Sequence, residues 1–104
     1  MARKALNLSS STTKVLEKMG NRIRSARLRR NISIEELAQK ATIGKSTLSL
    51  IEKGTPTVSI GAYAAVLAVL GLNEDFGLIA VDEVGKKQFW EQNLQRRERA
   101  SKRK

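Results

Sequence analysis

The chain has 104 residues and a formal net charge of +10, and it contains neither cysteine nor histidine. This length allows one small domain, and the charge predicts a polyanionic partner such as DNA, RNA or an anionic membrane surface. The missing residue types exclude disulfides, thiol nucleophiles and the usual zinc sites. The longest apolar stretch, residues 62–72, is too short to span a bilayer, and no signal peptide is apparent, so we expect a cytoplasmic protein.

The positive charge is concentrated in two runs. Residues 22–30 contain five arginines, and residues 96–104 contain six basic residues and one acidic residue. We expect a flexible arm at residues 1–11, a helical domain at residues 12–75, an extension at residues 76–95 and a basic tail after it. The tail is either a source of phosphate contacts or a disordered solubilising segment.

A first helix is predicted from Thr13 to about residue 30, where Asn31 is suited to end it. Gly20 and Asn21 are expected to weaken its middle. Its apolar positions are Val15, Leu16, Met19, Ile23, Ala26 and Leu28.

Two short helices follow, at about residues 34–41 and 45–53. Ser33 and Glu36 have the spacing of a capping box that starts the first of them. Residues 42–44 form the turn, and Gly54 with Pro56 ends the second helix.

A fourth helix is predicted at about residues 60–70, between a Ser59 cap and Gly71. Its expected inward residues are Ile60, Tyr63, Val66, Leu67 and Leu70. Residues 76–81 (FGLIAV) are a continuous apolar run that fits either a short buried strand or one and a half helical turns. The predicted fold class is therefore all-α, with room for one short C-terminal strand that pairs across a dimer.

The helices at 34–41 and 45–53 have the pattern of a helix-turn-helix, whose second helix enters the major groove of DNA. Ala38 is small where the two helices cross, Ile43 seals the turn, and Leu48 and Ile51 face inward. The outward residues are short or basic enough to reach base edges or phosphates. The alternative is an ordinary helical hairpin with solvated polar residues.

Four motifs within residues 16–72 extend this pattern: Arg22-Ile23-Arg24-x-x-Arg27, Ser33-x-Glu35-Glu36-Leu37-Ala38, Lys45-Ser46-Thr47-Leu48-Ser49 and Ile51-Glu52-Lys53-Gly54. Together they resemble the lambda Cro/C1-type helix-turn-helix domain of the XRE family. The resemblance implies five packed helices, a homodimer and a palindromic DNA operator. It also implies that Arg27 pairs with Glu52 and ties the first helix to the third beside a phosphate; otherwise these are two unrelated solvated charges.

The same resemblance implies roles by position. Base contacts are expected from Lys45, Ser46, Ser49 and Leu50. Contacts with the DNA backbone are expected from Arg22, Arg27, Ser33, Lys40, Thr47, Lys53 and Thr55. Two positions depart from the family pattern. Thr42 stands where glycine is common, and a positive φ there would cost roughly 1 kcal/mol of strain. Leu50 replaces a polar or basic residue, so it cannot donate a hydrogen bond, although it can contact a thymine methyl group.

The extension carries two large aromatic residues, Phe89 and Trp90, that are costly to leave in water. We expect the extension to fold back on the domain, to pack in a dimer or to bind another protein. The residues expected to make these contacts are Phe76, Leu78, Ile79, Val81, Phe89 and Trp90. This layout resembles HipB-like antitoxins, which implies an autoregulating repressor that holds a HipA-type kinase toxin on DNA.

Three functions stay open: an antitoxin of this kind, a stand-alone XRE regulator, and a non-specific nucleic-acid-binding protein. An enzyme is not expected, because no paired carboxylates stand out. Residues 43–47 (IGKST) lack the upstream glycine and strand of a phosphate-binding loop. The sequence offers no catalytic, cofactor or metal site.

Overall fold

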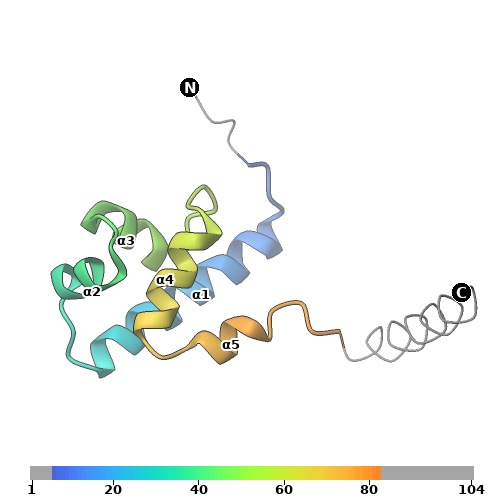
Figure 1. Cartoon of the computed structure of the whole chain (residues 1–104). Coiled ribbons are helices and arrows are strands. Elements are labelled where there is room, and N and C mark those ends of the chain that lie inside the picture. The colour runs from blue at the N-terminus through green and yellow to red at the C-terminus, as the bar shows by residue number, and fades with distance from the viewer. Residues whose placement is uncertain (1–5, 83–104) are drawn as a thin grey trace, which may run out of the picture.

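The computed structural model describes residues 6–82, which form five helices and no strand (Figure 1). The helices are α1 (Ser10–Arg29), α2 (Ile34–Ala41), α3 (Lys45–Glu52), α4 (Ile60–Val69) and α5 (Asn73–Gly77). The all-α prediction is confirmed, and the four predicted helices lie close to their expected positions. The fifth helix, which only the family resemblance implied, is α5.

Helix α1 begins earlier than predicted because Ser9 caps it. The Ser9 hydroxyl accepts a hydrogen bond from the backbone N–H of Thr12 at 3.2 Å. The last residues of the expected N-terminal arm therefore form the first turn of α1. At the other end Asn31 has a φ of 53°, in the left-handed region, and it ends the helix as predicted.

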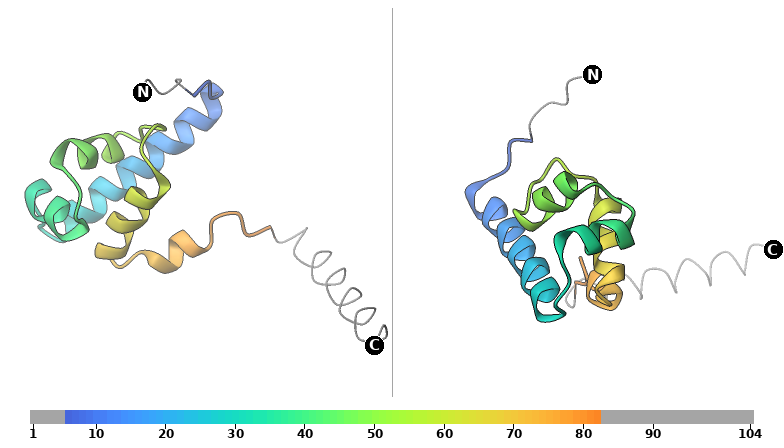
Figure 2. Two further views of the ribbon diagram at one scale, coloured as in Figure 1. Left: turned by 45° about the horizontal axis from the view of Figure 1, so that its top comes forward. Right: turned by 90° about the vertical axis from the view of Figure 1, so that its left-hand side faces the viewer.

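The long helix α1 lies along one side of the bundle and packs mainly against α3, whereas α2 packs against α3 and α4 (Figure 2). Helix α5 follows α4 after a short turn and packs against it. The core between these helices is made of small and medium-sized apolar side chains. Its members are Ile23, Ala26, Leu37, Ala38, Ala41, Leu48, Ile51, Tyr63, Val66, Leu67 and Leu70.

Three residues that helical spacing placed on inward faces are exposed instead. Val15 is 64% exposed, Leu28 is 47% exposed and Ile60 is 71% exposed. Val15 and Leu28 lie beside the more buried Leu16 and Arg27 on α1, and Ile60 is the first residue of α4. Apolar residues at helical spacing indicate a helix, but the spacing does not show which of them face the neighbouring elements.

Gly20 does not simply weaken α1, as the sequence suggested, because the helices cross closest there. A Cβ atom at Gly20 would lie 2.6 Å from the backbone N of Gly54 and 2.7 Å from the carbonyl oxygen of Glu52. Gly54 itself has a φ of +73°, and a Cβ on it would collide with the backbone of Leu16. The two glycines let α1 meet the end of α3 backbone to backbone.

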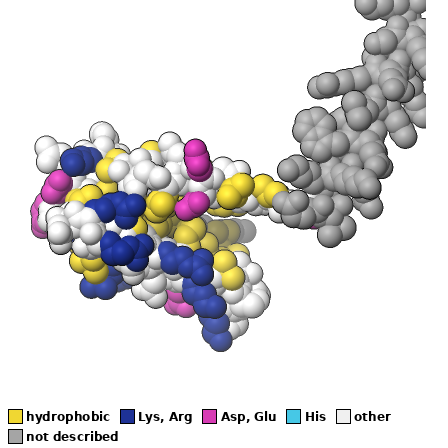
Figure 3. All heavy atoms as spheres, turned by 90° about the horizontal axis from the view of Figure 1, so that it is seen from below, with side chains coloured by type: hydrophobic (Ala, Val, Ile, Leu, Met, Phe, Trp, Pro, Cys, Tyr) yellow, Lys and Arg dark blue, Asp and Glu magenta, His cyan; other side chains and the backbone are white. Residues whose placement is uncertain are grey.

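Only the first two residues of the apolar run at 76–81 belong to α5, and residues 78–80 form a turn, so the single chain shows neither a strand nor one and a half helical turns there. Phe76 is half-buried against the core. Leu78, Ile79 and Val81 are 64%, 57% and 44% exposed. Figure 3 shows hydrophobic side chains gathered on the stretch that follows α5. Pairing of this run across a dimer stays a prediction.

Candidate nucleic-acid interface

Helices α2 and α3 form a helix-turn-helix that begins at the Ser33 cap. The Ser33 hydroxyl accepts a hydrogen bond from the N–H of Glu36 at 3.0 Å, which is the first half of the predicted capping box. The Glu36 carboxylate pairs with Lys40 at 3.1 Å, one helical turn further on. Ser33 thus uses its hydroxyl to start α2, and it remains exposed where a phosphate contact was predicted.

The turn between the helices depends on Thr42. Its φ of 60° and ψ of 41° place it in the left-handed region, which is the strained conformation considered from the sequence. The N–H of the next residue, Ile43, bonds to the carbonyl of Ala38 at 3.0 Å and closes the end of α2. Ile43 is half-buried against the core, as expected for a residue that seals the turn.

Helix α3 has a buried side and an accessible side. Leu48 and Ile51 are fully buried in the core. The four predicted base-contacting residues occupy positions i, i+1, i+4 and i+5 of the helix, and such positions share a side. Lys45, Ser46 and Leu50 are exposed and Ser49 is half-buried. Thr47, a predicted phosphate contact, is half-buried beside them.

Arg27 and Glu52 form the ion pair that the resemblance implied. Nε of Arg27 lies 2.7 Å from Oε2 of Glu52, and Nη2 lies 3.2 Å from Oε1. Nη1 donates to the carbonyl of Ile32 at 2.9 Å. Both side chains of the pair are less than a tenth exposed. Arg27 therefore holds α1 against α3 and the turn before α2, and the phosphate contact predicted for it stays a prediction.

Arg24, which was not among the residues predicted to contact DNA, lies beside α3, whereas the phosphate contact predicted for Arg22 stays a prediction. Arg24 lines a groove of about 840 Å³ together with Ser49 and Lys53. Arg22 lies in a different groove, beside α5 and Asp75. The two arginines are about 200° apart around α1. The signal for Arg24 was its spacing from Gly20 and Arg27, four residues before and three after, which puts all three on the face that meets α3.

The loop after α3 is fixed by hydrogen bonds at Thr55. Its N–H bonds to the carbonyl of Leu50 at 3.0 Å, and its own carbonyl accepts the Tyr63 hydroxyl at 2.8 Å. Burial raises the pKa of Tyr63, so its hydroxyl keeps the proton that it donates. Lys53 is exposed and Thr55 is half-buried at this end of α3, where phosphate contacts were predicted.

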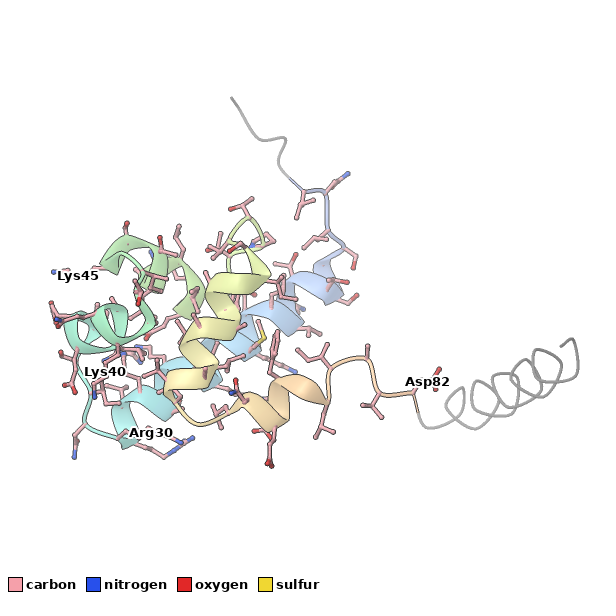
Figure 4. All side chains as sticks on the ribbon, in the orientation of Figure 1. Arg30, Lys40, Lys45 and Asp82 are labelled. Carbon is pink, nitrogen blue, oxygen red and sulfur yellow. The ribbon has the colours of Figure 1, made fainter. Side chains whose placement is uncertain are left out.

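Cationic side chains from three elements lie at one end of the molecule. Figure 4 shows Arg30, Lys40 and Lys45, from the end of α1, from α2 and from α3, far from Asp82 on the segment after α5.

Lys45 pairs with Glu35 at 3.3 Å. The pKa of Glu35 is lowered first by a hydrogen bond from its own backbone N–H and then by Lys45. Both carboxylates of the α2 first turn are therefore engaged by lysines.

Several predicted residues lie outside residues 6–82. Phe89 and Trp90, and with them most of the 76–95 extension and the whole basic tail, are not among the described residues. Within the described part, no helix combines the length and the apolar character needed to cross a bilayer. In the same residues, no three histidine, cysteine, aspartate or glutamate side chains come together as metal ligands would.

Comparison with known families agrees with this geometry. A family model described as a helix-turn-helix domain matches residues 18–75, which is more than half of the chain. The match covers most of α1 and the whole of α2, α3 and α4. A search of curated proteins gives no match. The fold, the turn geometry and this match together show that the chain belongs to the helix-turn-helix domain family.

Proposed function

We propose that this protein is a cytoplasmic transcriptional repressor that reads a palindromic DNA operator as a homodimer and has no enzymatic activity. The observation that carries this proposal is the accessible side of α3, which presents Lys45, Ser46, Ser49 and Leu50 from a rigid support. The Arg27–Glu52 pair and the Gly20–Gly54 crossing supply that support. Binding groups held on rigid helices are positioned more accurately than groups on loops.

Each part of this surface has a distinct task. Lys45 can donate to guanine acceptors in the major groove, the serine hydroxyls can bond to bases or phosphates, and Leu50 suits a thymine methyl group. Arg24 and Lys53, which border the same groove, suit phosphates. The net charge of +10 adds affinity for any DNA without adding sequence information.

A homodimer is supported by the apolar surface on the side of α5. A groove of about 420 Å³ is lined mainly by apolar residues, among them Val15, Phe76 and Ile79, with Arg22 and Asp75 at the same groove. The exposed Leu78 lies next to Ile79 along the chain. A single binding helix reads only half of a palindromic site, so two copies are needed to bind both halves.

The finer proposal is an antitoxin role, in which residues 76–95 hold a HipA-type kinase toxin on the operator. It is supported by the resemblance to HipB-like antitoxins and by the apolar residues exposed after α5. Purification of the tagged full chain, co-expressed with its genomic neighbours, tests it. Recovery of a kinase-like protein with wild type, and its loss with Trp90→Ala, is the expected result. Recovery of the homodimer alone would favour a stand-alone regulator.

Lys45→Ala tests the DNA-reading role of α3. Loss of a base contact should weaken binding to the operator by about 1–3 kcal/mol and should change binding to random duplex much less. Lys18→Ala is the matched control, because Lys18 is an exposed lysine on α1, outside the helix-turn-helix. Titration of labelled duplexes measures both affinities. An equal loss on operator and random DNA would reassign Lys45 to a phosphate.

A further inference from the structure

An acidic residue of α2 holds the first residue of the DNA-reading helix. Nζ of Lys45 lies 3.3 Å from Oε1 of Glu35, and the two side chains are 62% and 66% exposed. Figure 4 shows Lys45 projecting outward from the start of α3. The pair therefore joins the N-terminal ends of α2 and α3 across the turn, on the surface proposed to face DNA.

The electrostatics of α3 explain why this pair forms. The N-terminus of a helix carries partial positive charge, which disfavours a lysine there. Lys45 is nevertheless the first residue of α3, the Gly44 cap supplies no side-chain hydrogen bond, and the first turn has no acidic residue. Glu35, in the first turn of α2, supplies the missing negative charge from outside the helix.

We propose that Glu35 is a specificity-determining residue that positions Lys45 for a base and weakens binding to DNA that offers only phosphates. This inference rests on the proposed function. On random DNA, Lys45 exchanges Glu35 for a phosphate, and the carboxylate repels the DNA backbone. On the operator, Lys45 donates to a base acceptor from the place where Glu35 holds it, so the pair is kept and only the repulsion between the carboxylate and the DNA backbone remains. Glu35 thus disfavours both complexes but disfavours the random one more.

Glu35→Gln tests the proposal, because it removes the charge and keeps the shape. The matched control is Glu36→Gln, which removes one charge from the same helical turn and frees Lys40 instead of Lys45. The full-length variants are titrated with two labelled duplexes, one enriched by the wild-type protein from a random pool and one with the same bases scrambled. Each substitution is also made in the Lys45→Ala background.

We expect Glu35→Gln to tighten binding to the scrambled duplex by about two- to fivefold, the range of an exposed ion pair. Binding to the enriched duplex should tighten less, so the ratio of the two affinities falls. Glu36→Gln should tighten both equally and leave the ratio unchanged. In the Lys45→Ala background, Glu35→Gln should no longer change the ratio.

Two results would overturn the role of Glu35. One is an equal effect of Glu35→Gln and Glu36→Gln on the affinity ratio. It would show that both residues affect DNA binding only through their negative charge. The other is an effect of Glu35→Gln on the ratio that persists without Lys45. Failure of the proposed function looks different, because the wild-type protein itself would then bind the enriched and scrambled duplexes equally.

Discussion

At the scale of single residues, the turn of the helix-turn-helix holds a β-branched side chain in a left-handed conformation. Thr42 has a φ of 60°, where the Cβ atom of an L-residue crowds the backbone. Glycine carries no such penalty. The strain at Thr42 is local, because Ile43 and Ala38 still make the hydrogen bond that closes α2.

We predict that Thr42→Gly stabilises the protein by up to about 0.5 kcal/mol, because the relief of roughly 1 kcal/mol of strain is partly offset by the added freedom of the unfolded chain. Thermal unfolding should show a Tm higher by about 2–4 °C. The same substitution at Thr13, an exposed residue within α1, should lower the Tm. A lower Tm for Thr42→Gly would show that threonine is not strained at the turn.

The Arg27–Glu52 pair gives a second prediction at this scale. Glu52→Ala should destabilise the protein by about 3–5 kcal/mol, because it leaves the Arg27 charge buried without its partner. Replacing both residues, as Arg27→Met with Glu52→Leu, should cost clearly less, because no buried charge is left unpaired. Urea unfolding measures both changes. Equal losses for the single and the double variant would contradict a tightly coupled buried pair.

At the scale of elements, α2 and α3 could be predicted from the sequence almost to the residue, because their signals are local. The Ser33 cap starts α2 through a hydrogen bond three residues away, and the positive φ of Gly54 ends α3 directly after its last residues. The crossing at Gly20 could not be predicted in this way. The role of Gly20 depends on its close approach to Gly54, which is distant in the sequence. Helix propensity alone predicted that Gly20 weakens α1.

Local sequence also did not show which arginine of α1 lies at the candidate interface. The run of five arginines at residues 22–30 indicated a basic helix, but charge alone did not separate Arg24 from Arg22. The position of α3 against α1 makes that distinction, since it sets which side of α1 borders the groove with Ser49 and Lys53. The Arg27–Glu52 pair was predictable only through the family resemblance.

Because α1 and α3 cross closely at Gly20, replacing a glycine by alanine should change the stability of the protein in opposite directions at different positions. Gly20→Ala should destabilise the protein, although alanine is the better helix former, because the new Cβ meets backbone atoms of Ile51, Glu52 and Gly54 at 2.6–2.8 Å. Gly61→Ala, in α4, should stabilise it by up to about 1 kcal/mol. Its Cβ would meet only Ser59 Oγ, at 3.9 Å.

Urea unfolding of the two glycine variants measures these changes under one set of conditions. Stabilisation by Gly20→Ala would mean that α1 and α3 do not pack as closely as described. Opposite signs for the two variants are the expected outcome, and they would separate the effect of packing from that of helix propensity.

At the scale of the whole molecule, the described residues place the helix-turn-helix and the apolar stretch after α5 on different parts of the surface. Arg30, Lys40 and Lys45, at the end of α1, on α2 and on α3, lie on the side of the molecule away from Asp82 (Figure 4). Hydrophobic side chains line the segment after α5 (Figure 3). This separation would let one copy bind DNA through α3 and a second protein chain through the other surface at the same time.

Selection of duplexes from a random pool by the full-length protein tests whether α3 reads a DNA sequence. We expect enrichment of an inverted repeat whose half-sites are spaced by about one helical turn of DNA or a multiple of it. Lys45→Ala should lose preference at particular base positions within each half-site. If the wild-type protein enriches no sequence and binds every duplex equally, the charge alone drives binding and α3 does not read DNA.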